Sequence, residues 1–291
     1  MKDLKNLVLK FNRLTGGSIS LLFNDTVRLF NSLRYWYARA TRYQLSEISS
    51  EDHVTKKAVA ELKKYGVTCL PGMFVDLVEP LTEEFYSCLH QGKLENPVNN
   101  HVLEETGERS LMPAPKTREE AELLRHKTNN IQLKSPLLQS ELIKKLSSDK
   151  GTSQIADNYL KCKSLSTGVN FRLSFANSLT PEDTQIFHQD KDAHKVVKFF
   201  IYLTDVSEAD GPFQYVLGSH IGSPPMRIRR YHRIDEDDVL SIFKNKIKTC
   251  VGKKGDLIIA DTTGIHRGLK PIDADRLMLT LTRLPNPELG S

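Results

Sequence analysis

The sequence lacks the cysteine pairs that mark a disulfide framework, a zinc site or a redox motif. Its 291 residues contain 4 cysteines, at positions 69, 88, 162 and 250, and no C-x-x-C pair occurs. Thiols this sparse and scattered are typical of a reducing compartment. Long apolar runs are also missing, because no stretch approaches the ~20 residues that span a bilayer. The first apolar run, 7–9, is too short for a signal-peptide core. We therefore expect a soluble, cytoplasmic protein.

A broad basic surface is missing as well, although the formal net charge is +5. Residues 1–45 contain eight Lys/Arg and two Asp, whereas the remainder contains thirty-three basic and thirty-four acidic residues. The main domain is therefore not expected to bind nucleic acid. Apolar residues recur at helical spacing in the basic segment. We predict a helical N-terminal extension over 1–50 and a main domain over 51–291. The extension could contact a membrane surface or a protein, or pack across one end of the main domain.

Two halves of different character make up the main domain. Helices are predicted at 51–65, 79–90, 119–126 and 137–148, the first capped by Ser50 and ended by Gly66. A short strand is predicted at 67–70, and the irregular stretch 91–130 is either a substrate loop or disordered surface. Later segments rich in Phe, Ile, Val, Leu and Thr alternate with turns, at 170–179, 195–206, 213–216, 256–260 and 276–283. Short strands at this spacing predict a sandwich or barrel with flanking helices, an α+β arrangement with a mostly β core.

The segment 187–190, Phe-His-Gln-Asp, carries the first chemical signal. Residues two apart in a strand point to the same face, so His188 and Asp190 can reach one point. An imidazole and a carboxylate are two of the three ligands in the facial triad of non-haem iron(II) enzymes. The H-x-D triplet alone also fits a solvated surface segment, because Lys191 and Asp192 follow it.

A third ligand has to come from the end of another strand. The apolar strand predicted at 256–260 is followed by a bend of small residues and then by His266, at a rim where ligands can enter. Ten residues later, Arg276 begins the last predicted strand, and it returns towards the metal if these two strands are antiparallel neighbours. A planar, permanently charged guanidinium suits bidentate binding of a carboxylate. Considered singly, either residue could lie at the surface.

The ordered set of H-x-D, His and Arg is far more specific than any of its members. With it, the sequence resembles the phytanoyl-CoA dioxygenase-like family of iron(II)/2-oxoglutarate oxygenases over roughly residues 60–284. The resemblance rests on Arg276 and on segments 185–190, 198–206, 210–212, 218–220, 255–256 and 266–268. It implies a double-stranded β-helix, a cupin-like jelly roll, with iron held by His188, Asp190 and His266. It also implies that Arg276 binds the distal carboxylate of 2-oxoglutarate.

Two positions depart from the family pattern, and several polar residues remain ambiguous. Leu217 stands where the family often has Pro, and Lys270-Pro271 stands where it often has Asn, so the substrate is not indicated. The resemblance suggests Gln185 as a further cosubstrate contact. Asn170, Arg172 and Ser174 alternate with apolar residues, so they line either the barrel, beside the cosubstrate, or the solvent face. Lys198 and Tyr202 have the same two interpretations.

We therefore expect an enzyme that uses Fe(II), 2-oxoglutarate and O2 to hydroxylate a small organic substrate, releasing succinate and CO2. Related halogenases have a small residue in place of the carboxylate ligand, so Asp190 favours hydroxylation. One alternative is a cupin-like metal dioxygenase that needs no 2-oxoglutarate; an inward Arg276 speaks against it, because a buried cation needs a carboxylate partner. Another is a non-catalytic jelly-roll binding module, which an intact triad argues against. No Gly-rich phosphate loop indicates a CoA thioester.

Overall fold

The computed structural model describes residues 52–95, 101–103, 109–111, 115, 117–133, 135–221 and 233–286. The extension predicted over 1–50, with its membrane or protein contact, lies outside these residues, so both stay predictions. Among the helices of the described part, none is long and apolar enough to cross a membrane.

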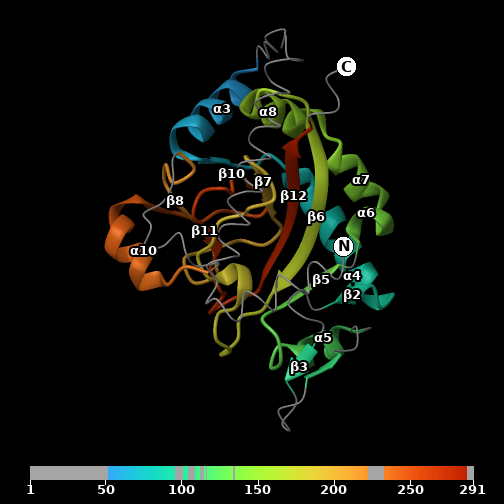
Figure 1. The fold of residues 1–291 in the computed structure, drawn as a ribbon. Coiled ribbons are helices and arrows are strands. Elements are labelled where there is room, and N and C mark those ends of the chain that lie inside the picture. Colours follow the sequence, from blue (N-terminus) through green and yellow to red (C-terminus); the bar gives the residue numbers. More distant parts are fainter. Residues whose placement is uncertain are drawn as a thin grey trace, which may run out of the picture.

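Two antiparallel sheets face each other and form a jelly-roll-like double-stranded β-helix (Figure 1), which confirms the predicted fold class. The larger sheet has the order β1-β10-β7-β12-β6-β5-β2 and the smaller has β11-β8-β9, while β3 and β4 pair separately. The larger sheet contains β1 (Val67–Leu70), β2 (Leu94–Glu95), β5 (Asn130–Leu133), β6 (Ser164–Ser174), β7 (Val197–Tyr202), β10 (Leu257–Asp261) and β12 (Arg276–Pro285). The others are β3 (His101–Leu103), β4 (Arg109–Leu111), β8 (Phe213–Val216), β9 (Ile247–Cys250) and β11 (His266–Gly268).

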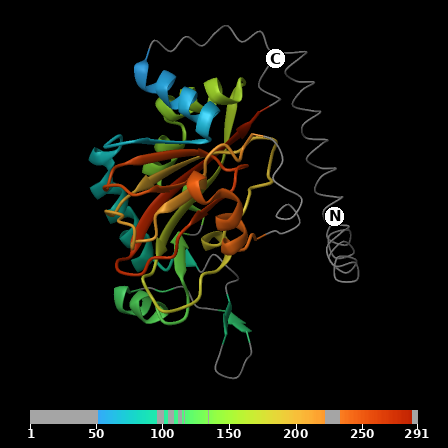
Figure 2. The same cartoon turned by 90° about the vertical axis from the view of Figure 1, so that its left-hand side faces the viewer.

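Helices that precede β6 in the chain cover the outer face of the larger sheet, and α10 packs beside the smaller one (Figure 2). They are α3 (His53–Tyr65), α4 (Val78–His90), α5 (Arg118–Leu124), α6 (Pro136–Gln139), α7 (Glu141–Ser147), α8 (Lys150–Leu160) and α10 (Glu236–Phe243). Single 3-10 turns occur at η1 (Val75–Leu77), η2 (Asp183–Gln185) and η3 (Lys244–Lys246).

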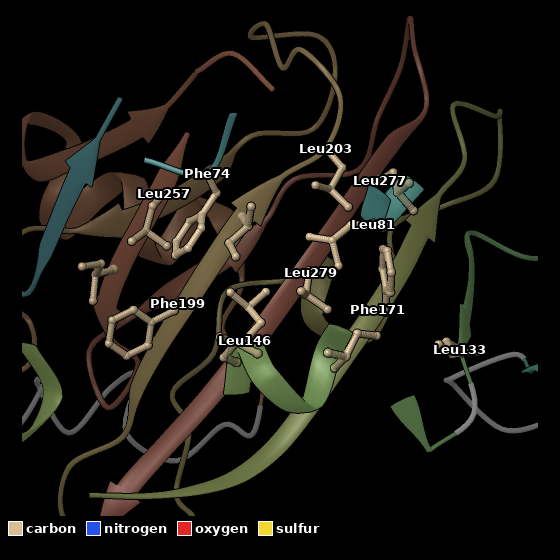
Figure 3. Close-up of a cluster of buried hydrophobic side chains, with 14 of the residues drawn as sticks. Phe74, Leu81, Leu133, Leu146, Phe171, Phe199, Leu203, Leu257, Leu277 and Leu279 are labelled. Atoms are coloured by element: carbon tan, nitrogen blue, oxygen red, sulfur yellow. The ribbon is translucent and has the colours of Figure 1, made fainter. Parts of the chain in front are cut away.

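Successive side chains of β12 point to opposite faces of the larger sheet, one in the hydrophobic core and the other towards the smaller sheet. Leu277, Leu279 and Leu281 are buried on the outer face, within the main hydrophobic cluster (Figure 3). Full burial of such a side chain stabilises the fold by about 1.5–3 kcal/mol. The alternate residues, including Arg276 and Met278, face the smaller sheet. We call this the inner face of the larger sheet, and it is where the polar side chains gather.

The first helix shows one local prediction that is wrong and one that is confirmed. Ser50 does not cap α3; Asp52 does, because its carboxylate accepts hydrogen bonds from the backbone N–H groups of Val54 and Thr55. Gly66 ends the helix at φ 81°, and a side chain there would meet the Tyr215 hydroxyl, 2.3 Å from an added Cβ. Other elements are absent from the sequence prediction altogether: β2, β3, β4, β5, β9, β11, α8 and α10.

Candidate metal centre

Three side chains from two chain segments meet where the smaller sheet faces β7. Ligand atoms of His188, Asp190 and His266 all lie within 4.8 Å of one another. Backbone pairing joins the segments, because His188 and His266 exchange two N–H···O=C hydrogen bonds of 2.9 and 3.0 Å. The Asp190 N–H donates to the Thr262 carbonyl at 2.8 Å. The structure therefore brings together the three residues that the sequence singled out.

Each imidazole is held in the tautomer that a metal ligand requires. His188 Nδ1 lies 2.9 Å from the Ile186 carbonyl, and His266 Nδ1 lies 2.9 Å from the Gly264 carbonyl. Because a carbonyl only accepts, both Nδ1 atoms carry the proton and both Nε2 atoms keep a lone pair. The two Nε2 atoms lie 3.9 Å from different oxygens of Asp190. A ring nitrogen anchored to the backbone while the other faces the site is typical of metal-binding histidines.

The charges of the three residues also suit a divalent cation. Burial lowers the pKa of His188 well below its ordinary value, with a further contribution from His266, and burial lowers the pKa of His266 as well. Burial alone would raise the pKa of Asp190, but His266 and Lys198 outweigh it and leave this pKa below its ordinary value. Lys198 Nζ lies 2.8 Å from Asp190 Oδ2. Two neutral imidazoles and one ionised carboxylate are the donor set of non-haem iron(II) centres.

A buried carboxylate fixes the loop that joins β10 to β11. Asp261, 1% exposed, accepts hydrogen bonds from the Thr263 N–H at 3.1 Å and from the Thr263 hydroxyl at 2.7 Å. Its other oxygen accepts from the Tyr159 hydroxyl of α8 at 2.6 Å. The loop contains Thr262 and Gly264, whose carbonyls hold Asp190 and His266. This network is not apparent from the sequence, because Tyr159 and Asp261 are separated by 102 residues.

Arg276 is buried in the barrel and forms no ion pair within the described residues. Its guanidinium makes only long hydrogen bonds, of 3.3 Å to the Leu269 carbonyl and 3.4 Å to the Ser174 hydroxyl, and its Nε has no partner. Burial lowers its pKa, yet an arginine stays charged. Gly268 leaves space beside it, since an added Cβ there would lie 3.3 Å from Nη2. A buried cation without a carboxylate partner fits a ligand that brings one.

Arg276 reaches the site from a different strand arrangement than the one considered from the sequence. That arrangement had β12 beside the strand that precedes His266, but β7 lies between β10 and β12. Arg276 instead projects from the larger sheet, while His266 belongs to the smaller sheet that faces it. Gly268, two residues after His266 on β11, lies beside the Arg276 guanidinium.

The ambiguous residues of β6 lie on the inner face of the barrel, not on a solvent face. Ser174 contacts Arg276, and Arg172 donates to Thr184 of η2 at 3.0 Å. Asn170 donates to Gln132 at 2.5 Å. Gln185 is buried at the end of η2, where its Oε1 accepts from the Glu182 N–H; its Nε2 has no hydrogen-bond partner in the part of the chain that the structure describes. The predicted cosubstrate contacts of Asn170 and Gln185 stay predictions.

Comparison with known sequences identifies one family. Residues 62–270 match the model of the phytanoyl-CoA dioxygenase family. None of the curated protein sequences matches the chain significantly.

Solved structures with the same fold support this match at low sequence identity. The α-ketoglutarate-dependent epimerase SnoN from nogalamycin biosynthesis has a TM-score of 0.54 and 14% identity, covering 80% of this chain and 83% of its own. HygX from Streptomyces hygroscopicus, with nickel and 2-oxoglutarate bound, has a TM-score of 0.55 and 14% identity, covering 79% and 87%. EctD from S. alaskensis, with bound Fe, has a TM-score of 0.55 and 16% identity, covering 84% and 79%.

Proposed function

We propose that this chain, which belongs to the phytanoyl-CoA dioxygenase family, is an iron(II)- and 2-oxoglutarate-dependent oxygenase that hydroxylates a small organic substrate. The observation that carries the proposal is the convergence of His188, Asp190 and His266, with ligand atoms within 4.8 Å. Three protein ligands of this kind hold one side of a metal ion and leave its other side open for cosubstrate and O2. When bound, iron(II) and 2-oxoglutarate would supply the oxidation chemistry, with succinate and CO2 as products.

The residues of the chain have separate tasks in this proposal. His188 and His266 bind the metal through Nε2, while their Nδ1–H groups hold the rings against backbone carbonyls. Asp190 contributes the anionic ligand, and its carboxylate leaves no room for a halide in its place, which favours hydroxylation over halogenation. Arg276 binds the distal carboxylate of 2-oxoglutarate, which supplies the partner that its buried guanidinium lacks. Asn170 and Gln185 lie on the same inner side as further candidate contacts.

Among the alternatives, an oxygenase that does not use 2-oxoglutarate leaves the charge of Arg276 uncompensated. The solved structures of similar fold include an epimerase and a carbocyclase, both named as α-ketoglutarate-dependent. At such low identity they indicate the fold alone, so hydroxylation rests on the residues of this chain. A substrate screen that follows succinate release and identifies the product by mass would separate hydroxylation from these other outcomes.

The decisive test is an anaerobic titration of the purified protein with Fe(II) and then with 2-oxoglutarate, followed through the charge-transfer absorption of the chelate. We expect His188→Ala and His266→Ala to weaken metal binding by about 100-fold or more, beyond the loss typical of outer contacts. His90→Ala, at the exposed end of α4, is the matched control and should bind normally. Arg276→Gln should leave metal binding intact and raise the Kd for 2-oxoglutarate by about 100-fold, the cost of breaking a buried charge pair.

Two results would overturn the proposal. One is unchanged metal affinity in His188→Ala and Asp190→Ala. The other is substrate oxidation that proceeds without added 2-oxoglutarate and without succinate release, which would favour the cupin-like alternative.

A further inference from the structure

The inner face of the larger sheet holds a second guanidinium, that of Arg172 in β6. Its strand neighbours, Phe171 and Leu173, are buried in the outer hydrophobic cluster, so Arg172 points to the opposite side, towards the smaller sheet. It donates through Nη1 to the Thr184 hydroxyl, at 3.0 Å. Thr184 belongs to η2, the turn that leads into His188. Arg172 therefore lies beside the segment that carries the first metal ligand.

The hydrogen-bonding capacity of Arg172 is largely unused. Its Nη2 lies 3.5 Å from Gln132 Oε1, at the limit of a hydrogen bond, and its buried Nε has no hydrogen-bond partner among the described residues. No carboxylate forms an ion pair with it in the described part of the chain. Asp183, in the same turn, pairs with Arg233 instead. A guanidinium with five N–H donors and one good acceptor is prepared for an anion.

The position of Arg172 separates it from the cosubstrate cation. In the sheet register, Arg172 is opposite Met278, whereas Arg276 is opposite Ser174. Arg172 is therefore one inner-face position away from Arg276, on the neighbouring strand, on the side of η2. Burial lowers the pKa of Arg172 to about 10; the charges of Asp183 and Glu182 act against this lowering, and the charge of Arg276 adds to it. Two like charges this close, in a poorly solvated site, favour binding of more than one anionic group.

We propose that Arg172 binds an anionic group of the substrate, a carboxylate or a phosphate, while Arg276 binds the cosubstrate. This inference rests on the proposed function, because it assigns Arg276 to 2-oxoglutarate. The flat fork of a guanidinium pairs with two oxygens of either anion and so fixes the substrate at one end. The substrate class is accordingly an organic acid or a phosphate ester.

Two anion sources have to be separated in the test, the substrate and the cosubstrate. The first arm measures the Kd for 2-oxoglutarate on the Fe(II) protein without oxygen. Arg172→Gln should change this Kd by less than about 3-fold, whereas Arg276→Gln should raise it about 100-fold. An equal rise in both variants would assign Arg172 to the cosubstrate and overturn the proposal.

The second arm titrates acetate and inorganic phosphate into the Fe(II) protein saturated with 2-oxoglutarate, by calorimetry. At least one anion should bind the wild type, and Arg172→Gln should weaken it by about 10-fold or more. Thr184→Val, which removes the hydroxyl acceptor but keeps the guanidinium, should bind within about 3-fold of wild type. No binding of either anion to the wild type, or equal binding to Arg172→Gln, would overturn the proposal.

Two further variants keep the outcome decisive. If Arg172→Gln does not fold, Arg172→Lys preserves the charge and should lose part of the anion affinity, because an ammonium cannot bind two oxygens in parallel; unchanged affinity contradicts the proposal. If iron or 2-oxoglutarate fails to bind the wild type, the proposed function fails. The anion titration is then repeated on metal-free Arg276→Gln protein with and without Arg172→Gln, which tests Arg172 independently.

Discussion

The hydroxyl of Tyr159 offers a sharp test of how the metal loop is held. Tyr159→Phe removes the 2.6 Å hydrogen bond to Asp261 and leaves the ring in place. The ring also keeps its contact with Lys195, whose Nζ lies 4.1 Å from the centroid, so the change isolates the hydroxyl. A hydrogen bond to a buried charged group contributes about 1.5–3 kcal/mol. The other oxygen of Asp261 keeps both of its bonds to Thr263, so we expect a loss of about 2 kcal/mol.

Urea unfolding measures this loss, and the slope of the unfolding free energy against urea should be unchanged. For a chain of this size, about 2 kcal/mol corresponds to a fall of about 3–4 °C in Tm. The matched control is Tyr65→Phe, because Tyr65 is 37% exposed at the end of α3 and should lose less than about 0.5 kcal/mol. A Tyr159→Phe protein as stable as Tyr65→Phe would refute the reasoning. We further expect about 3- to 10-fold weaker metal binding, as for groups that orient metal ligands indirectly.

Four other perturbations test separate parts of the structure. Leu279→Ala should cost about 2–5 kcal/mol in urea unfolding, because its fully buried side chain would leave a cavity between β12 and the helices; a loss below 1 kcal/mol, as at an exposed site such as Leu138, would contradict the assigned core. Gly264→Ala should weaken metal binding, since its Cβ would lie 2.0 Å from the Tyr215 hydroxyl and displace the carbonyl that holds His266; normal affinity would show that the loop can move freely. A free metal concentration of about 100 times Kd should stabilise the fold by about 2.7 kcal/mol and so raise Tm, and a chelator should reverse the rise. An unchanged Tm would mean that the metal does not bind preferentially to the folded state. The hydrogen bond from Arg267 lowers the pKa of Glu236. This pair therefore stabilises the fold at pH values above the ordinary carboxyl pKa, and the stabilisation is lost as the pH falls through the lowered pKa. Glu236→Gln should reduce the acid-dependent loss of unfolding free energy by less than about 1 kcal/mol, because the carboxylate is half exposed; an unchanged pH dependence of unfolding would show that the pair contributes nothing.

What the sequence predicted was set by local pattern. The 67–70 and 213–216 strands have the predicted bounds, because their apolar residues are flanked by Gly and Pro turns. The strand predicted from 170 begins at Ser164 and ends at Ser174, since pairing with β12 extends it backwards. Helix α8 was missed although its N-cap, Asp149, is a standard signal. Its Gly151 and Asn158 lower the helical propensity, and packing against α3 overrides that.

The metal ligands could be predicted from the sequence, whereas the residues that hold those ligands in position could not. His188 and Asp190 are two residues apart, and the sequence predicted that they share one face of a strand. The structure has only isolated bridges at Phe187 and His188, and the backbone hydrogen bonds of His188 with His266 and of Asp190 with Thr262 set the positions of the two ligands. The partners that hold them come from distant segments: Lys198 on β7, Tyr159 on α8 and the carbonyls of residues 262 and 264. Such contacts depend on sheet order, which the sequence left open: β12 lies beside β7 and β6 and not beside β10. The residue types indicated the chemistry of the site, whereas the topology of the sheets decides which residues are in contact.

Charge balance across the inner face links the two proposals. Arg172, Arg276 and Lys198 are cations there, and Asp190 is the carboxylate that pairs with one of them. A divalent metal adds two positive charges and doubly ionised 2-oxoglutarate adds two negative charges. Their joint binding therefore leaves the net positive charge of these four side chains unchanged. Buried charge of one sign is unfavourable unless a partner offsets it. An anionic substrate at Arg172 would offset it, and a neutral substrate would leave that guanidinium without an ion-pair partner among the described residues.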